Sequence, residues 1–340
     1  MRRRGRGQST GGRWTGGLAM GLLGMVLAGL VAEGAARLAF PRWKEFNAER
    51  VQTTVDVAGH GPVAVGRAGF DGWVAQSNGD FRAHVRINAA GWRDNEPAEA
   101  ADGRLWALGE SFAFGWGVET EESFGAIAAR ALGMPFYNVA SPMADLIGGQ
   151  ALLARMPSTV HPRAVVLGLS VETDLRDYEH PPEIATTPPH TATTRLKNAA
   201  KQSALCTLVA QVIVRVNGSN DAPVAVAPRT VDDNRIAAIL ESSLAKIGQI
   251  RAMVPAEAPF VVLVIPARDE LRNDNAEYRA LRLGLTERLK MQGIAVADPF
   301  EALAAAGEGK VYFRHDGRWS AQGHRLAGEA VAQALTPTSP

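Results

Sequence analysis

Ser111 is the strongest candidate in the chain for a reacting side chain, because it follows a short apolar run and precedes a helical pattern. Residues 105–108 (Leu-Trp-Ala-Leu) have the composition of a buried strand, and Gly109 ends that run. Reacting groups in open parallel sheets gather at the carboxyl ends of strands. Glycines on both sides of Ser111 allow a sharp turn and close approach to a ligand. The pattern predicts a serine nucleophile with turn amides able to stabilise an oxyanion; the alternative is an ordinary turn serine.

Strand and helix patterns alternate through the rest of the chain. We expect strands at residues 136–139, 164–169, 260–265 and 294–297, and helices at 121–132, 232–253, 278–291 and 321–335. Such alternation predicts a parallel sheet covered on both faces. The sequence therefore predicts one α/β domain over residues 66–336, with residues 178–230 as an inserted proline-rich loop and surface helix.

The N-terminus carries a membrane signal. Five arginines precede residues 14–32, a run of 19 residues without charge. This is close to the ~20 residues that cross a bilayer as a helix. Because basic residues stay inside, we expect a cytoplasmic tail at 1–13, an anchor at 14–36 and a linker at 37–65. The domain would then lie in the periplasm, held to the inner membrane by a single span. A cleaved signal peptide is the alternative.

Composition excludes some classes of function. The 340 residues contain 36 Lys and Arg against 35 Asp and Glu, so no basic excess marks a nucleic-acid binder. Cys206 is the single cysteine, and no Cys/His group has the spacing of a zinc site. We therefore expect no metal, no other cofactor and no nucleic-acid partner; oligomeric state cannot be predicted.

Three blocks together resemble the SGNH (GDSL-like) hydrolases, in particular their membrane-anchored bacterial type. Gly109-Glu110-Ser111-Phe112 resembles that family's Gly-Asp-Ser-Phe block, with glutamate in place of aspartate. Residues 86–94 (Arg-Ile-Asn-Ala-Ala-Gly-Trp-Arg-Asp) resemble the run that precedes it, and residues 311–324 resemble the closing block. The resemblance spans residues 80–335. It implies a three-layer, flavodoxin-like α/β domain with a parallel sheet, preceded here by one transmembrane helix.

The resemblance also implies site residues, and here the catalytic blocks are altered. It makes Ser111 the nucleophile and Asp316 the residue that orients a histidine base. Arg318 occupies the place of that histidine, and a guanidinium cannot accept a proton at physiological pH. His324 and His315 are the possible substitute bases. The family's oxyanion donors would correspond to the amide of Ser111, to Ser141 in place of a glycine, and to Thr173 in place of an asparagine.

Two functions follow from these patterns. The first is an exported, membrane-tethered ester hydrolase or O-acyltransferase acting on acylated carbohydrates or glycolipids through Ser111. The second is a catalytically inactive SGNH-like protein that binds a glycan or an envelope partner, because a cation fixed beside Asp316 can recognise an anionic sugar. Glu172, Asp174 and Asp177 form a small acidic group after a predicted strand, which solvent or a ligand could contact.

Overall fold

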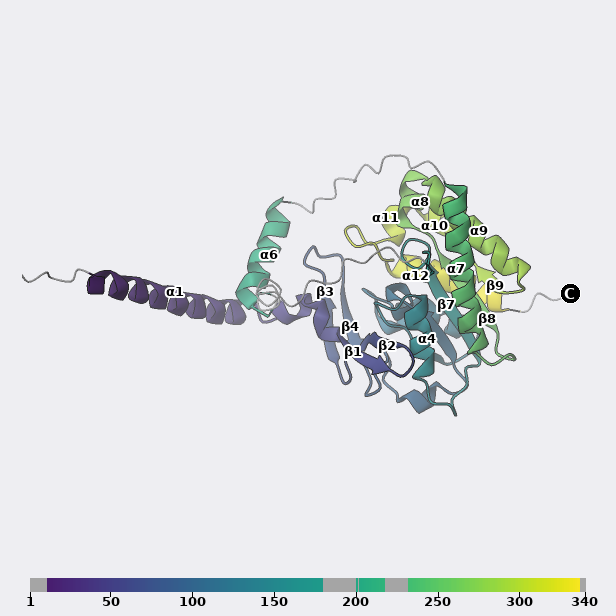
Figure 1. Cartoon of the computed structure of the whole chain (residues 1–340), viewed down its shortest axis with the longest axis horizontal. Helices are drawn as coiled ribbons and strands as arrows, with labels where there is room; N and C mark the ends of the chain where they lie inside the picture. Colours follow the sequence, from purple (N-terminus) through teal and green to yellow (C-terminus); the bar gives the residue numbers. More distant parts are fainter. Residues whose placement is uncertain (1–10, 180–199, 201, 218–231, 337–340) are drawn as a thin grey trace, which may run out of the picture. The chain divides into compact units, whose positions relative to one another are not determined.

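Five parallel strands form the central sheet of the computed structural model, which describes residues 11–179, 200, 202–217 and 232–336. They are β5 (Leu105–Gly109), β6 (Phe136–Asn138), β7 (Ala164–Ser170), β8 (Phe260–Ile265) and β9 (Ala295–Ala297), in the spatial order β6-β5-β7-β8-β9 (Figure 1). Counted along the chain this order is 2-1-3-4-5, the flavodoxin-like order. The strand order reverses between β5 and β7, which pair from Leu105 with Ala164 to Gly109 with Gly168.

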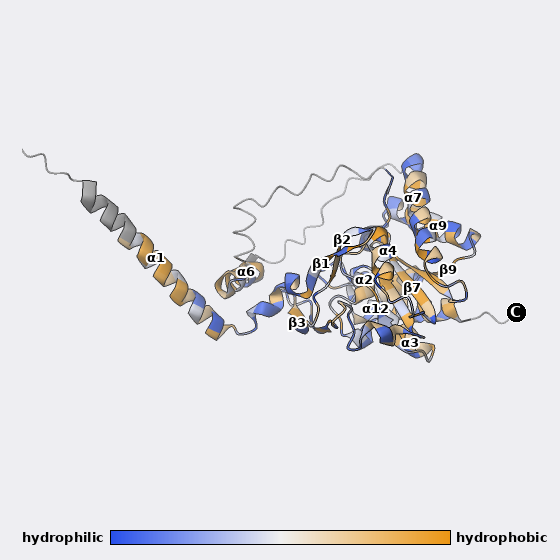
Figure 2. Cartoon of the chain, turned by 60° about the horizontal axis from the view of Figure 1, so that its bottom comes forward, coloured by the Kyte–Doolittle hydropathy of each residue, from blue (hydrophilic) through white to orange (hydrophobic). Residues whose placement is uncertain are grey.

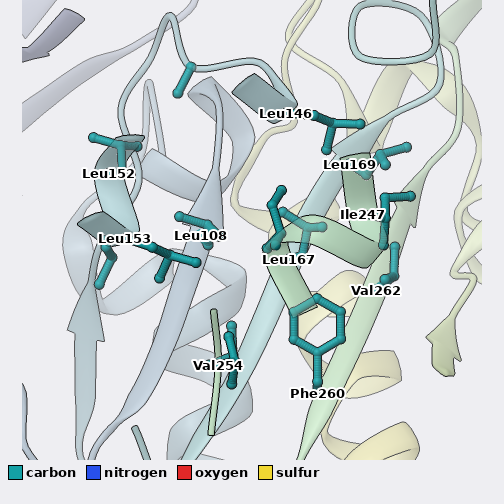
Figure 3. Close-up of a cluster of buried hydrophobic side chains, with 14 of the residues drawn as sticks. Leu108, Leu146, Leu152, Leu153, Leu167, Leu169, Ile247, Val254, Phe260 and Val262 are labelled. Atoms are coloured by element: carbon teal, nitrogen blue, oxygen red, sulfur yellow. The ribbon is translucent and has the colours of Figure 1, made fainter. Parts of the chain in front are cut away.

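Side chains alternate between the two faces of this sheet, because successive residues of a strand point to opposite sides. Leu108, Leu167 and Val262 pack in one cluster, with the helices α4 (Leu146–Ala154), α7 (Asp233–Ala252) and α9 (Ala276–Met291) (Figure 3). Ala107 and Val166 pack in the other, with α2 (Ser111–Phe114), α3 (Phe124–Ala131), α10 (Phe300–Ala306), α11 (Glu308–Val311) and α12 (Ala321–Leu335). The result is the expected three-layer α/β arrangement.

Two antiparallel hairpins precede the sheet. The first pairs β1 (Gln52–Val57) with β2 (Gly61–Gly66), and Val57, Val63 and Val65 are buried in the core cluster that contains α4. The expectation of an irregular linker over residues 37–65 therefore differs from the structure. A period-two pattern of apolar residues around the turn at residues 58–60 supplies the missed strand signal.

The second hairpin pairs β3 (Asp71–Ala75) with β4 (Arg82–Arg86), and its turn faces the closing block of the sequence. The Gln76 side chain donates a hydrogen bond to Asp316, and Asp80 binds His315. The domain also contains four short helical segments: η2 (Ala48–Val51), η3 (Ala98–Ala101), η4 (Thr120–Glu122) and α8 (Arg268–Asn273). The hairpin thus supports the site although nothing in its own sequence predicts that contact.

A separate compact unit contains α1 (Gly11–Ala39), η1 (Trp43–Phe46) and α6 (Ala204–Asn217). Within α1, residues Met20–Ala39 are long and apolar enough to cross a membrane, and Figure 2 shows their hydrophobic colouring. The surface helix expected within the insertion at residues 178–230 corresponds to α6; residues 180–199, 201 and 218–230 of that insertion lie outside the described residues. The proline-rich loop expected from residue 178 lies largely outside them too.

Gly109 provides the first testable prediction, because β5 approaches β7 closely there. Its φ is +135°, and an added Cβ would lie 2.4 Å from the carbonyl oxygen of Gly168. Gly109→Ala should cost about 1–2 kcal/mol for the backbone conformation and about 1–3 kcal/mol more for crowding. Gly103→Ala is the matched control, since its φ is +66° with no atom within 4 Å. Urea unfolding of the full-length protein in detergent should show the larger loss at 109; equal losses would contradict this packing.

Candidate active site

Ser111 lies where the end of β5 turns into α2. Glu110 is the residue that precedes this short helix, and Ser111 is 2% exposed. The helix ends at Gly115, whose φ is +79°; a Cβ there would lie 2.9 Å from the Arg93 guanidinium. The chain therefore turns sharply on both sides of Ser111 and encloses its side chain.

The strand order reverses beside Ser111, and this reversal brings a second segment to the site. Residues 171–174 form a turn directly after β7, the neighbour of β5. In open α/β sheets ligands bind outside the carboxyl ends of strands at such a switch point. The acidic residues Glu172 and Asp174 are carried by this turn, so both strands deliver carboxyl groups to the same edge of the sheet.

Glu110 directly precedes Ser111 in the chain, and Ser111 influences the ionisation of its carboxyl group. The hydroxyl and the amide of Ser111 both lower the pKa of Glu110. Burial is the largest influence on Glu110 and raises its pKa; the charge of Arg318 and the Ser111 hydrogen bonds oppose this, and the charge of Glu172 adds to it. Glu110 is thus an ionisable acceptor beside a serine hydroxyl, with a pKa above the ordinary glutamate value.

Asp174 is buried, and the charge of Glu110 affects its ionisation. One carboxylate oxygen accepts a 2.8 Å hydrogen bond from the Ser170 amide, and Asp174 is 4% exposed. Burial and then the charge of Glu110 raise the pKa of Asp174 well above its ordinary range. Because two close carboxylates do not ionise together readily, the charge of Glu110 favours the protonated form of Asp174.

Glu172, by contrast, lies at the surface of the turn. Partial burial of its carboxyl and the charge of Asp269 raise the pKa of Glu172, and Arg268 opposes them. This residue extends the acidic edge of the site toward α8.

Asp316 and Arg318 form an ion pair. Arg318 Nη1 lies 3.0 Å from Asp316 Oδ1 and 3.2 Å from Oδ2, and the Arg318 amide also donates to Oδ1. The Gln76 amide donates to the other carboxylate oxygen at 2.7 Å. The Asp316 side chain is 5% exposed, whereas that of Arg318 is 35% exposed. Asp316 therefore fixes a cation that remains open to solvent.

His315 and His324, the two possible substitute bases, have other partners. His315 Nδ1 lies 2.9 Å from Asp80 Oδ1, and its amide donates to the same carboxylate. His324 is fully buried between α3 and α12, where its Nδ1 accepts a 3.3 Å hydrogen bond from the Phe124 amide. Its ring stacks on Phe124 and meets Trp319 edge-on. No hydrogen bond joins either imidazole to Ser111 among the described residues.

The expected oxyanion donors differ in availability. The Ser141 hydroxyl donates to the Ala64 carbonyl and its amide donates to the Gly109 carbonyl, so both of its donors are engaged in the fold. Thr173 is exposed on the turn after β7. The amide of Ser111 lies at the start of α2. The solvent-open Arg318 is the further donor at this site, and the sequence blocks did not assign it that role.

Arg93 holds the backbone of the segment that follows α2. It is 1% exposed, and its guanidinium donates to the carbonyls of Phe114, Gly115, Val118 and His84. These bonds hold the segment that follows α2 in place. In the sequence, Arg93 belongs to one of the blocks that resemble the family, but no role could be predicted for it. Its guanidinium binds only backbone carbonyls, so no particular side chain in the sequence identifies its partners. Among the described residues, no three His, Cys, Asp or Glu side chains are arranged to hold a metal ion.

A flavodoxin-like sheet with a serine at its switch point is the arrangement that the SGNH resemblance implies, and comparison with known proteins agrees. Residues 225–340, about a third of the chain, match the family described as "SGNH hydrolase-like domain, acetyltransferase AlgX". This match includes Asp316 and Arg318 but not Ser111. It confirms the SGNH-like character of the domain. No match to a curated protein was found.

Solved structures that are similar to this chain include proteins named as G-D-S-L family members and a carbohydrate esterase. A lipolytic protein assigned to the G-D-S-L family from Desulfitobacterium hafniense has 12% identity and a TM-score of 0.42, covering 69% of this chain and 100% of that one. A G-D-S-L family member from Veillonella parvula has 12% identity and a TM-score of 0.39, with coverages of 68% and 97%. A carbohydrate esterase family 2 enzyme from Corynascus thermopiles has 16% identity and a TM-score of 0.40, with coverages of 71% and 67%.

His324 should make stability depend on pH. Burial, and then the charge of Arg93, lowers its pKa from 6.5 to about 3 in the folded state. The unfolded chain therefore binds the extra proton first, and the free energy of unfolding should fall by about 1.4 kcal/mol per pH unit from pH 6.5 down toward 3.

His324→Gln should remove this slope while lowering stability at neutral pH, because an amide oxygen can replace the Nδ1 acceptor only imperfectly. His161→Gln is the control, since His161 is exposed. Urea titrations across the pH range measure both. A wild-type slope that survives His324→Gln would show that another group causes it.

Proposed function

We propose that this chain is an exported, membrane-tethered SGNH-like enzyme that transfers or hydrolyses acyl groups on acylated glycans or glycolipids, with Ser111 as the nucleophile. The observation that carries the proposal is the burial of Ser111 at the switch point, directly after Glu110, whose carboxyl group is influenced by the charge of Arg318. The match to an SGNH-like acetyltransferase domain supports acyl chemistry as the reaction class.

Glu110 is the proposed base. As Ser111 Oγ attacks the ester carbonyl, its proton passes to the Glu110 carboxylate and a tetrahedral oxyanion forms. Collapse of that intermediate breaks the bond to the sugar oxygen, which leaves with the proton from Glu110. Water or an acceptor hydroxyl then attacks the carbonyl of the acyl-Ser111 ester and gives its proton to Glu110. Collapse of this second intermediate breaks the bond to Ser111 Oγ, which takes the proton back from Glu110. The raised pKa of Glu110 makes it a better proton acceptor than an ordinary carboxylate.

Arg318 is the proposed electrostatic stabiliser. Its cation is held by two bonds to Asp316 and still exposes 35% of its side chain, so it is fixed before the reaction begins. A preorganised donor of this kind stabilises negative charge that develops in the transition state. On this proposal Asp316 orients an arginine instead of a histidine.

The membrane segment supports the proposed location. Met20–Ala39 is the candidate span, and the arginines that precede it in the sequence favour a cytoplasmic N-terminus. The α/β domain would then work in the periplasm, close to the outer face of the inner membrane.

A second function, glycan or envelope-partner binding without catalysis, is favoured by one observation. Neither His315 nor His324 forms a hydrogen bond with Ser111, and the place of the expected imidazole holds a cation paired with Asp316. Such a pair suits recognition of an anionic sugar. The two functions differ in whether Ser111 is chemically required.

Ser111→Ala should reduce release of acetate from aryl acetates and acetylated oligosaccharides to background, because it removes the nucleophile. Glu110→Gln should lower the rate by about 10²–10⁴, because a neutral amide can accept the hydrogen bond but not the proton. Ser158→Ala and Glu301→Gln are matched controls at exposed positions. The measurement uses full-length protein in detergent. Activity that persists in Ser111→Ala would exclude the proposed nucleophile.

The pH dependence tests the role of Arg318. Glu110 must be ionised to accept a proton, and the Arg318 charge lowers the pKa of Glu110. Arg318→Gln should therefore raise that pKa and shift the acidic limb of the kcat/KM profile to higher pH, whereas Arg318→Lys should leave the limb nearly in place. A limb that moves to lower pH in Arg318→Gln would contradict Glu110 as the titrating base.

Arg318→His separates the enzyme from the binding protein. It places an imidazole beside Asp316, where a histidine base is expected from the resemblance. An inactive wild-type protein that gains Ser111-dependent activity on this substitution would favour the binding function. A wild-type protein that is already active and depends on Glu110 supports the enzyme.

A further inference from the structure

We propose that α6 is a second membrane-binding element, which lies in the outer interface of the bilayer beside the end of α1 and contacts lipid through its aliphatic side chains. The inference rests on the proposed membrane anchor. It assigns a partner, the lipid surface, to a helix that is separated from α1 by more than 160 residues of sequence.

The start of α6 is attached to α1 by a specific cap. The Glu33 carboxylate accepts hydrogen bonds from the amides of Ala204 and Leu205 at 3.0 Å, and from the Ser203 hydroxyl at 2.7 Å. These amides belong to the first turn of α6, which has no intrahelical partner for them. Arg37, one turn further along α1, pairs with the same carboxylate.

Apolar packing reinforces this cap. Ala36 on α1, Trp43 on η1 and Ala204 on α6 are buried together, and Phe40 and Leu205 pack against them. α6 runs across the end of α1 instead of alongside it (Figure 1). A helix held crosswise at the end of a span has the orientation of a helix that lies in the membrane plane.

The position of the cap along α1 fixes its depth. Glu33 precedes Ala39, the last residue of the candidate span, by six residues. At about 1.5 Å per residue this separation is ~9 Å along the helix axis. Interfacial helices bury their apolar faces by roughly 5–10 Å at the boundary between headgroups and acyl chains. A span that ends at Ala39 therefore places the start of α6 within the interface.

The composition of α6 fits that environment. Ala204–Val214 is an apolar stretch in which only Thr207 and Gln211 are polar, and none of its residues is charged. Val209 is 48% exposed, and Val212 and Ile213 are each 52% exposed. Cys206 is exposed as well, and residues at positions 206, 209 and 213 share one face of a helix. In water this exposure of aliphatic surface is unfavourable, whereas lipid would cover it.

The surrounding residues have the character of a membrane boundary. Trp43 follows the span, and the cations of Arg37 and Lys44 lie 5.2 and 5.7 Å from its ring centroid. Phe40 and Phe46 stack with 5.5 Å between their centroids. Aromatic rings with neighbouring basic side chains are typical of the headgroup level. This continuity with the span favours the bilayer, and not a second copy of the chain, as the occupant of the α6 face.

Cys206 allows a direct test, because it is the only cysteine of the chain. The full-length protein, labelled there with the fluorophore NBD, is reconstituted into phosphatidylethanolamine–phosphatidylglycerol vesicles. We expect strong quenching by a lipid with a nitroxide high on its acyl chain, and protection from aqueous iodide. Val209→Asp with Ile213→Asp should reverse both effects severalfold. Glu33→Ala, which removes the cap, should also increase quenching by iodide.

A label on Cys206→Ser/Glu301→Cys is the matched control, because Glu301 is exposed on α10 in the other unit, and we expect iodide to quench it. Protein that does not float with the vesicles overturns the anchor and this inference together. Protein that floats while iodide quenches the Cys206 label overturns only the α6 inference. A label shielded from both quenchers shows that protein, not lipid, covers the α6 face, and also overturns it. The wild-type result remains decisive if the aspartate variant fails to fold.

Discussion

The close approach of β5 and β7 determines where the chemistry of this protein can occur. Gly109 pairs with Gly168, and an added Cβ at 109 would lie 2.4 Å from the Gly168 carbonyl oxygen. The absence of a side chain at Gly109 lets the two strands lie this close, whereas a Cβ at Gly168 would instead meet the Phe124 ring at 3.0 Å. Their parallel pairing then brings the turns after both strands to one edge, where Ser111, Glu110 and Asp174 meet.

The carboxyl groups of Glu110 and Asp174 bring negative charge into a buried site, and two features of the structure compensate for it. Burial and the charge of the neighbouring Glu110 raise the pKa of Asp174, which disfavours a second anion there. Arg318 supplies positive charge, and Asp316 holds it in position with support from Gln76. Arg93 contributes on the opposite side by fixing the backbone after α2, so the turn that bears Ser111 is braced by contacts outside the reacting groups.

Local sequence patterns predicted the elements whose signal is contained in a few neighbouring residues. The apolar run at residues 260–265 is β8, and the helical pattern at 321–335 is α12, both as expected. The alternation of strands and helices predicted the parallel sheet, but the reversal of strand order beside Ser111 is known only from the structure. The hairpin of β1 and β2 was missed because breakers at residues 59–62 concealed a period-two pattern, and breakers mark hairpin turns as well as linkers.

Contacts between distant segments could not be predicted from one sequence. Gln76 is 240 positions from Asp316, and Glu33 is 171 positions from Ala204. A glutamine in a turn and a glutamate near the end of an apolar helix have many possible partners, and only the folded chain selects one. The same holds for His315, whose partner Asp80 comes from the second hairpin. Residue types identified the candidates, but tertiary packing decided which of them interact.

The two departures from the resembling blocks are physically linked. Glutamate in place of aspartate at 110 keeps a carboxyl group directly before Ser111, and Ser111 lowers the pKa of that group. Arginine in place of histidine at 318 removes a proton acceptor but adds a permanent cation, which stabilises the ionised form of Glu110. On the proposed function, Glu110 would take the part of the base that Arg318 cannot fill, and the charge of Arg318 would set the pH at which Glu110 can accept a proton.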